Sequence, residues 1–513
     1  MKNIASIINF VRSVEPRSDD DGFLIATLNE ELALCRKYGW RSTVLFQYDA
    51  LVRDDYMDLI AGYPETEKGL WLEVVQPLCE ACGIAWAGRY VWDWAKGCNL
   101  LSHYAPEERR RLIDAAFEGF FARFGAYPEV VGCWMLDSVS LAYMYEKYSI
   151  KAACICRDQF GTDYMTLWGG YYNGGYYPCK NNVVCPAGSL QTQIGVPVFR
   201  MLGPDPIYQY DMGLGEPEKA QQVCTLEPVY ADGGGSRAWV DWYLKENYNG
   251  KCLSHAYAQF GQENSFGWEE IEKGLPMQFE KLSPLVKSGK VSLMTLGESG
   301  KWFRDTFALT PPAAMCTDTD WKGQGTGSLW YNCRNYRVNI LSRGGKLWIR
   351  DLHLFDDRYR PGVTSDRNAE ITTGNFNLPV MDGFRFSKGN VRAGIFVETP
   401  ALQDPGDLAF VTSTPDETTA AAAAGNVRFT AAETALAVEL PDGAYLRFVT
   451  AEVPYLPYQK VTPKTLYMRF SGFGDAPYRY ALSLAAGAFR QDEKGLLIEP
   501  EDGKIIINTR SYK

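Results

Sequence analysis

Residues Ser254–Trp268 read SHAYAQFGQENSFGW, which has the form of a strand that ends in a polar turn and leads into a helix. The apolar run Ala256–Phe260 stops at a glycine, and three polar side chains follow it: Gln262, Glu263 and Asn264. In α/β barrels the carboxyl ends of the strands carry the catalytic groups. The alternative interpretation is a loop whose polar side chains only cap the next helix.

Runs typical of strands and of helices alternate from Ile4 to about residue 300. The predicted strands are Ile4–Val14, Ser42–Phe46, Gly69–Val75, Glu129–Leu136, Ile150–Cys156, Val196–Met201, Ala256–Phe260 and Val291–Leu296. Such alternation implies parallel strands joined by right-handed helical crossovers. Seven or eight units predict a (β/α)7–8 barrel over residues 1–310.

The pattern changes near Pro311, where helical periodicity ends and short alternating apolar runs begin. Lys346–Leu352, Tyr445–Val449 and Thr465–Phe470 are examples, and Gly, Pro and Asp cluster between such runs. These features predict antiparallel strands. We therefore expect an all-β sandwich domain over residues 311–513. The alanine-rich piece Glu417–Ala424 favours a short helix or a surface loop instead.

Composition limits the classes of function. The chain has 513 residues, of which 46% are apolar and 22% charged, as in globular proteins with large cores. Its net charge of −10 argues against non-specific binding to nucleic acid. No run approaches 18 uninterrupted apolar residues, so we expect no membrane span.

Thirteen cysteines lie between Cys35 and Cys333, mostly inside apolar runs. Their odd number and the lack of a recognisable secretory signal at the N-terminus favour reduced thiols in a cytoplasmic protein. A lone Cys79-x-x-Cys82 pair has no second pair at zinc-site spacing. A homo-oligomer is compatible with these features.

Carboxylates recur at the predicted carboxyl ends of the strands: Glu15, Asp49, Glu73, Asp137, Asp158 and Glu263. Glycoside hydrolysis needs two of them, one to attack or activate water and one to protonate the leaving oxygen, and it needs no cofactor. We expect Asp137 to be the nucleophile or base, Glu263 the acid, and Glu73 a third catalytic group. Alternatively, Asp137 only caps the helix that begins at Ser138.

Two other functions stay open. A metal-dependent carbohydrate deacetylase would hold its metal with histidines and an aspartate. The chain has three histidines, His103, His255 and His353, and none of them stands at HxxxH or HxH spacing. This scarcity disfavours a histidine metal site, although a carboxylate-only site remains open. The third possibility is a non-catalytic protein that binds carbohydrate.

Two long aromatic segments interrupt the strand–helix alternation, and long connections inside compact domains usually carry function. They surround Trp92 and Trp168. Aromatic faces pack against sugar rings, while amides and charged groups bind the hydroxyls. The side chains expected to bind a carbohydrate are Glu15, Arg17, Trp92, Asp93, Asp158, Gln159, Trp168, Tyr171, Asn173, Gln262 and Asn264. The alternative is that the aromatic residues only pack these segments onto the barrel.

Several segments resemble the layout of polysaccharide deacetylases. They are KYGWRSTVLF at Lys37–Phe46, TEKGLW at Thr66–Trp71, and Tyr127–Asp137 followed by AYMYEKYSIKAACICRDQ. The first 300 residues therefore resemble the glycoside hydrolase/deacetylase (β/α)7-barrel superfamily, which also includes the family 57 and family 38 glycosidases.

The resemblance implies a carbohydrate-active barrel, with two departures from the deacetylases. Glu15-Pro16-Arg17 stands in place of their Asp-Asp motif, and Trp71–Gln76 in place of their paired histidines. Family 57 enzymes use a nucleophile after strand four and an acid after strand seven, which corresponds here to Asp137 and Glu263. We therefore expect a glycoside hydrolase with two carboxylates and no metal or other cofactor.

Overall fold

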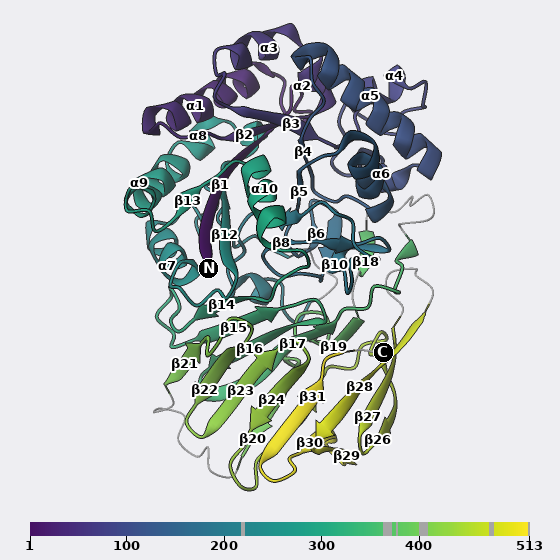
Figure 1. The fold of residues 1–513 in the computed structure, drawn as a ribbon, viewed down its shortest axis with the longest axis vertical. Helices are drawn as coiled ribbons and strands as arrows, with labels where there is room; N and C mark the ends of the chain where they lie inside the picture. The colour runs from purple at the N-terminus through teal and green to yellow at the C-terminus, as the bar shows by residue number, and fades with distance from the viewer. Residues whose placement is uncertain (217–220, 363–371, 376–377, 400–408, 471–476, 511–513) are drawn as a thin grey trace.

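The computed structural model describes residues 1–216, 221–362, 372–375, 378–399, 409–470 and 477–510. Figure 1 shows helices around a parallel sheet in the N-terminal half and antiparallel sheets in the C-terminal half. No helix within the described residues has the length and apolar character needed to cross a membrane.

The predicted strand–helix alternation is present as a curled sheet of seven parallel strands. In sheet order these are β12 His255–Phe260, β1 Lys2–Val11, β2 Thr43–Phe46, β3 Glu67–Trp71, β4 Val130–Cys133, β5 Ala152–Ile155 and β11 Val198–Arg200. Nearly every residue of β2, β4, β5 and β12 is buried, as strands covered on both faces require.

The two outer strands of this curled sheet approach each other through a short antiparallel strand, β8 Gly174–Tyr176. β8 pairs with β11, and its Gly175 N–H donates to Nε2 of His255 on β12 at 3.0 Å. The last predicted strand is shorter than expected. It is β13 Ser292–Leu293, which pairs with β1, and α10 Leu296–Thr306 follows directly and contacts β1 and β5.

Helices follow the strands in the order that the sequence predicts, and Figure 1 shows them around the curled sheet. On α1, buried Leu24, Leu28 and Leu32 recur every four residues and form one apolar face. The helices are α1 Gly22–Tyr38, α2 Tyr48–Leu51, α3 Asp54–Ala61, α4 Gln76–Ala81, α5 Pro106–Phe124, α6 Ser138–Tyr148, α7 Arg237–Asn247, α8 Trp268–Ile271, α9 Gly274–Lys287 and α10, with short 3-10 turns η1 Gly97–Asn99, η2 Leu101–His103, η3 Gln209–Asp211 and η4 Asn264–Phe266.

The second aromatic segment folds into β-hairpins between the two halves of the chain. β6 Gln159–Thr162 and β7 Met165–Trp168 form one hairpin, and β9 Pro178–Cys179 and β10 Asn182–Pro186 form another. A further strand, β18 Thr372–Asn375, pairs with β7, so the C-terminal half contributes to this layer.

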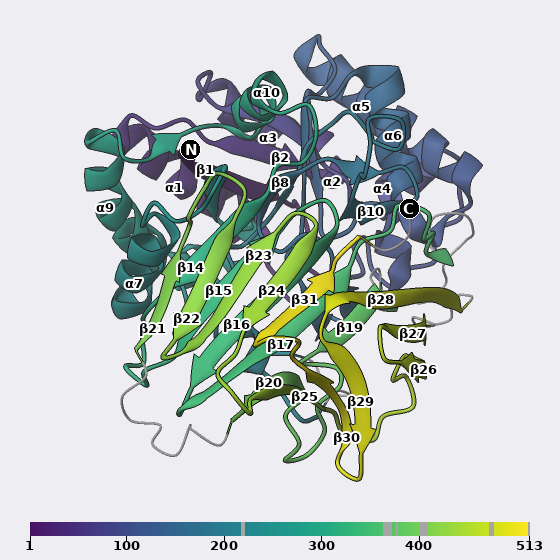
Figure 2. The same ribbon diagram turned by 60° about the horizontal axis from the view of Figure 1, so that its bottom comes forward.

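The C-terminal half contains two large antiparallel sheets, which Figure 2 shows from below. The first contains β14 Ala313–Thr317, β15 Gly327–Asn332, β16 Tyr336–Arg343, β17 Lys346–Leu354, β19 Leu378–Asp382, β20 Gly394–Glu398, β25 Tyr445–Val449, β30 Gly495–Glu499 and β29 Ala488–Asp492. The second contains β21 Phe410–Ser413, β22 Ala420–Ala424, β23 Val427–Ala432, β24 Ala435–Glu439, β31 Lys504–Asn508, β28 Tyr478–Ala486, β27 Thr465–Phe470 and β26 Tyr458–Thr462.

Apolar side chains of both antiparallel sheets belong to one core cluster, for example Val338 of β16 and Val438 of β24. The expectation of a helix or loop at Glu417–Ala424 was wrong, because Ala420–Ala424 forms β22. Four of its five alanines are buried, and its neighbours β21 and β23 supply the backbone partners. Alanine's helical preference is small enough for such tertiary pairing to override it.

A buried ionic network joins the two halves. Asp158, just after β5, accepts from Arg200 at 3.0 Å and from Arg337 of β16 at 2.5 Å. Arg337 also makes two bonds of 3.0 Å to Asp351 of β17. All four side chains are nearly inaccessible to solvent.

We expect Arg337→Met to lower the free energy of unfolding by about 3–5 kcal/mol, because it leaves two buried carboxylates without this cation. Chemical denaturation followed by circular dichroism measures the change. Arg490→Met is the matched control, because Arg490 forms an exposed ion pair with Glu499 that is worth about 0–1 kcal/mol. Equal stability of the two variants would contradict a structural role for the network.

Candidate active site

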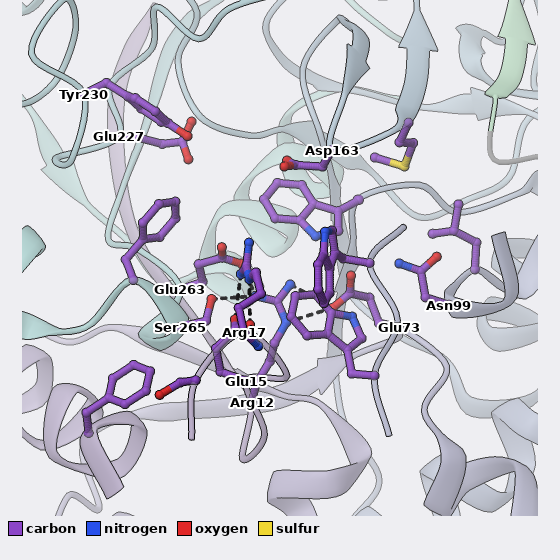
Figure 3. Close-up of a pocket in the computed structure, with 18 residues that line it drawn as sticks. Arg12, Glu15, Arg17, Glu73, Asn99, Asp163, Glu227, Tyr230, Glu263 and Ser265 are labelled. Atoms are coloured by element: carbon purple, nitrogen blue, oxygen red, sulfur yellow. Dashed lines mark hydrogen bonds and ion pairs between the residues drawn. The ribbon is translucent and has the colours of Figure 1, made fainter. Parts of the chain in front are cut away.

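A pocket of about 470 Å³ lies at the carboxyl ends of the parallel strands. Residues that follow β1, β3, β4 and β12 line it, together with the long loops beyond them. Its volume is within the usual range for small-molecule sites. Figure 3 shows carboxylates and aromatic rings arranged around Arg12 in this pocket.

The turn after β12 places Glu263 in the pocket. Gly261 has a φ of +95°, and a Cβ there would lie 2.4 Å from the carbonyl oxygen of Ile8. Glycine is thus required for both the turn and the close approach to β1. The chain then continues beside β1, with Phe10 N–H donating to Gln262 O at 3.3 Å and Phe10 opposite Glu263.

Asn264 fixes the backbone of Arg12. Its Oδ1 accepts from Arg12 N–H at 2.9 Å, and its Nδ2 donates to Arg12 O at 2.8 Å and to Leu24 O at 3.1 Å. This buried amide therefore joins the turn after β12, the end of β1 and the first turn of α1. Asn264 has a positioning role and does not line the pocket.

Arg12 lies between two carboxylates. Its Nη1 pairs with Glu263 and donates to Ser265 Oγ at 3.0 Å, and its Nη2 and Nε donate to Glu73 Oε2 at 2.9 and 3.2 Å. The guanidinium carbon is 3.9 Å from the ring centroid of Trp92, within the range of cation–π attraction. Burial alone would lower the pKa of Arg12, but Glu263 and Glu73 outweigh burial and raise it.

Glu73 is held by one of its two oxygens. Besides Arg12, Oε2 accepts from Trp71 Nε1 at 2.7 Å and from Gln47 Nε2 at 2.8 Å. Oε1 is buried with no hydrogen-bond partner among the described residues. Burial raises the pKa of Glu73, and Arg12 and Trp71 oppose that rise.

Glu227 lies on the loop after β11 and faces the same pocket as Glu263 (Figure 3). Only 6% of Glu227 is exposed, and its oxygens accept from Thr225 Oγ1 at 2.8 Å and from Gln262 Nε2 at 3.4 Å. Burial raises its pKa to about 7, and the negative charge of Glu263 adds to that rise. Glu227 can therefore carry a proton near neutral pH.

The mouth of the pocket is formed by two loops. The tip of the β6–β7 hairpin contributes Asp163, whose φ is +51°. From the N-terminal side, Arg17 lies 4.8 Å from the ring centroid of Trp94 and makes two bonds of 2.6 Å to Glu15. Positive φ in a residue other than glycine is uncommon and clusters at functional sites.

Five of the predicted site residues line this pocket: Glu15, Arg17, Glu73, Trp92 and Glu263. Gln262 and Asn264 do not line the pocket, but each contacts a residue that does. Gln262 donates to Glu227, and Asn264 accepts from the backbone N–H of Arg12. The strand-end rule located Glu15, Glu73 and Glu263, because the carboxyl ends of parallel strands meet at one edge of the sheet. Trp92 was expected from its long aromatic segment.

The structure does not bring Asp137 into this pocket with Glu263. Asp137 is the N-cap of α6 and accepts from Ser140 N–H at 2.9 Å. It also lies 3.0 Å from Arg109 of α5. The helix cap and the ion pair with Arg109 explain the contacts of Asp137. A polar residue directly after a strand fits a helix cap as well as it fits a catalytic group.

The remaining predicted binding residues also lie outside the pocket lining. Asp158, Trp168 and Tyr171 are buried where the two halves meet; Trp168 Nε1 donates to Asp382, and Tyr171 OH donates to Pro311 O. The other three make local contacts: Gln159 accepts from Cys156 Sγ, Asn173 donates to Tyr257 O, and Asp93 pairs with Arg89. These contacts fit the alternative interpretation, in which the aromatic segments only pack onto the rest of the protein.

Sequence reasoning missed Arg12, Glu227 and Asp163. Arg12 directly follows β1 in the structure, whereas the strand predicted from the sequence ran on to Val14 and placed Arg12 inside it. Glu227 lies in an irregular loop, TLEPVYADGGG, whose sequence carries no periodicity that would orient it. Only the folded chain places it beside Gln262.

Five carboxylates line the pocket, but among the described residues they do not form a group whose ligand atoms lie close enough to share a metal ion. No histidine is among the residues that line it. Asp351, His353 and Asp382 form a metal-compatible group elsewhere, in the C-terminal half. There Arg337 already pairs with Asp351, and Asp382 accepts from Trp168 Nε1 at 2.8 Å. These bonds make the group part of the ionic network between the halves.

No family model and no curated protein sequence matches the chain. Among solved structures, a protein from Parabacteroides distasonis described as a glycoside hydrolase/deacetylase aligns at a TM-score of 0.54 and 14% identity, over 72% of this chain and 90% of its own. A polysaccharide deacetylase from Mycobacterium smegmatis aligns at 0.34 and 11% identity, over 59% and 91%. A 4-alpha-glucanotransferase from Thermococcus litoralis aligns at 0.31 and 11% identity, over 99% and 97%.

At 14% identity the first match shows a shared fold only. The reaction has to be inferred from the residues of the site. The resemblance suggested by the sequence is thus confirmed for the fold. Over most of its length, the chain has the fold of the structure described as a glycoside hydrolase/deacetylase.

Proposed function

We propose that this protein is a glycoside hydrolase that uses Glu227 as the proton donor and Glu263 as the nucleophile or base. The observation that carries the proposal is that two carboxyl groups in one pocket have opposite environments. Glu263 pairs with Arg12, whereas the pKa of Glu227 is raised to about 7 by burial. Glycoside hydrolysis uses two carboxyl groups in one site, one that donates a proton and one that acts as nucleophile or base.

Glu227 supplies the proton in this mechanism. Cleavage of a glycosidic bond leaves negative charge on the departing oxygen, and a neutral carboxyl within reach protonates it as the bond breaks. Burial keeps Glu227 neutral up to about pH 7, and Gln262 and Thr225 fix its orientation.

Glu263 acts on the sugar carbon. It is 8% exposed at the pocket wall, more open than Glu73 at 1%. Its carboxylate either bonds to the anomeric carbon or takes a proton from the water that does so. This assignment reverses the role expected for Glu263 from the sequence, because Glu227 has the environment of an acid.

Arg12, Glu73 and Trp92 hold the reacting carboxylate in place. Glu73 and Trp92 confine the guanidinium of Arg12 from two directions, and Arg12 confines Glu263. Preorganised groups of this kind avoid reorganisation during the reaction. The aromatic rings of Trp92, Trp94 and Trp134 line the pocket and suit the apolar faces of a sugar.

The wider assignment follows the same reasoning. We propose that the curled sheet with β8 is a (β/α)7 barrel over residues 1–310, and that residues 311–513 form a β-sandwich that supports it. The thirteen cysteines are all unpaired, which supports a reducing, cytoplasmic setting. The alternative of a metal-dependent deacetylase has less support. Glu73 and Glu263, which could otherwise be metal ligands, are both paired with Arg12.

Replacing either carboxyl tests the two roles separately. We expect Glu227→Gln to lower kcat/KM by about 10²- to 10⁴-fold on aryl glycosides with poor leaving groups, and by far less where the leaving phenol needs no proton. Glu263→Gln should abolish turnover of both classes of substrate. Steady-state kinetics on a panel of aryl glycosides measures both effects.

Asp137→Asn is the matched control, since Asp137 is also a buried carboxylate at a strand end. It should lower the melting temperature through the α6 cap and Arg109, yet leave kcat per folded molecule unchanged. An effect of Glu227→Gln that is equal for all leaving groups would contradict the acid role. Loss of kcat in Asp137→Asn would restore Asp137 as a candidate.

The pH dependence gives a third test. A raised pKa keeps Glu227 protonated below about pH 7 and ionised above it. We therefore expect kcat/KM to fall about tenfold per pH unit above that value, because the donor loses its proton. The alkaline limb should be present in the wild type on a substrate with a poor leaving group and should disappear in Glu227→Gln on the same substrate. An unchanged limb in that variant would assign it to another residue.

A further inference from the structure

A second groove lies on the C-terminal half and is lined mainly by residues of β26, β27 and β28. Figure 2 shows these strands at one end of their sheet. The groove has a volume of about 960 Å³. Its lining combines cations with tyrosines: Lys460, Tyr467, Arg469, Tyr478 and Arg479. These residues come from three neighbouring strands, so they do not form a basic run in the sequence.

Two arginines face each other across the strands of this groove. In the antiparallel register of β27 and β28, Arg469 is the direct partner of Arg479, and both are exposed. Like charges placed opposite each other in a sheet repel. Among the described residues, neither arginine has an acidic partner within ion-pair distance. The pair therefore forms a local excess of positive charge on a chain of net charge −10.

The third cation extends this charge to the edge of the sheet. Lys460 of β26 is opposite Tyr467 of β27, and its Nζ lies 6.0 Å from the centre of that ring. Tyr467 is 43% exposed, so its ring is accessible to a ligand. An exposed ring beside a row of cations offers a flat contact surface together with charge.

No carboxylate is among the described residues that line the groove, and a carboxylate that contacts its Tyr478 is already engaged. Asp356 is bonded by Arg358 at 2.9 and 2.6 Å and accepts from Tyr478 OH at 3.0 Å. Its charge is thus balanced by Arg358, and Lys460, Arg469 and Arg479 remain as the net charge of the groove.

We propose that this groove binds an anionic polysaccharide, a sugar chain that carries carboxylate or sulfate groups. Arginines form strong charge-assisted bonds with such groups, and the tyrosine faces suit the sugar rings between them. The net charge of −10 disfavours a nucleic acid, whose non-specific binding depends mainly on the charge of its phosphates, so a glycan fits the groove better. The site is separate from the pocket around Arg12 and does not depend on the function proposed there.

Affinity electrophoresis of the whole protein through gels that contain polygalacturonate tests the proposal. We expect retardation that weakens as salt is added, and no retardation by neutral dextran. The double variant Arg469→Gln/Arg479→Gln should weaken binding by about tenfold or more. The matched control is Arg428→Gln, because Arg428 is an exposed arginine on β23 of the same sheet, outside the groove.

A thermal-shift measurement checks that the double variant folds. Relief of the Arg469–Arg479 repulsion should keep or raise its melting temperature, and added polygalacturonate should stabilise the wild type but not the variant. Equal binding by the double variant and the wild type, or equal binding of dextran, would overturn the proposal. Tighter binding of single-stranded poly(dT) than of polygalacturonate would assign the groove to nucleic acid instead.

Discussion

The buried guanidinium of Arg12 is the constraint on which the site depends. A cation inside a protein is costly unless it is paired and fully bonded, and Arg12 meets this requirement with Glu73, Glu263 and Ser265. Each partner is then fixed in turn. The turn at Gly261 brings Glu263 beside the end of β1. The amide of Asn264 holds the backbone of Arg12 there.

This pairing also separates the two carboxyls of the proposed mechanism. Glu263 has the positive charge of Arg12 beside it, whereas Glu227 has burial and the negative charge of Glu263. In the proposed mechanism, the carboxylate paired with this cation is the nucleophile or base, and the buried carboxyl is the proton donor. The long loops and the β6–β7 hairpin complete the pocket, and the C-terminal sheets hold that hairpin layer through the ionic network around Arg337.

The fold was largely predictable from the sequence, because strand and helix periodicity are local and the strands follow one another around the curled sheet. Glu73 and Glu263 were predictable for the same reason, since each ends a strand. Asp137 has an identical local pattern, yet it caps α6 beside Arg109, and only tertiary contacts separate the two cases. Glu227 was not predictable, because an irregular loop carries it to the pocket. The aromatic segment around Trp168 was expected to bind substrate, but it packs where the halves meet.

The proposed function depends on Glu227 holding a proton near neutral pH. Infrared difference spectroscopy measures this directly, by following the carbonyl band of protonated carboxyl groups as pH rises in the wild type and in Glu227→Gln. Other buried carboxyls with a raised pKa, such as Glu31, should give bands that both proteins share. A proton on Glu227 predicts a further band in the wild type that disappears with a midpoint of about pH 7 and is missing from the variant. Identical titrating bands in the two proteins, or no carboxyl that titrates in that range, would contradict this assignment.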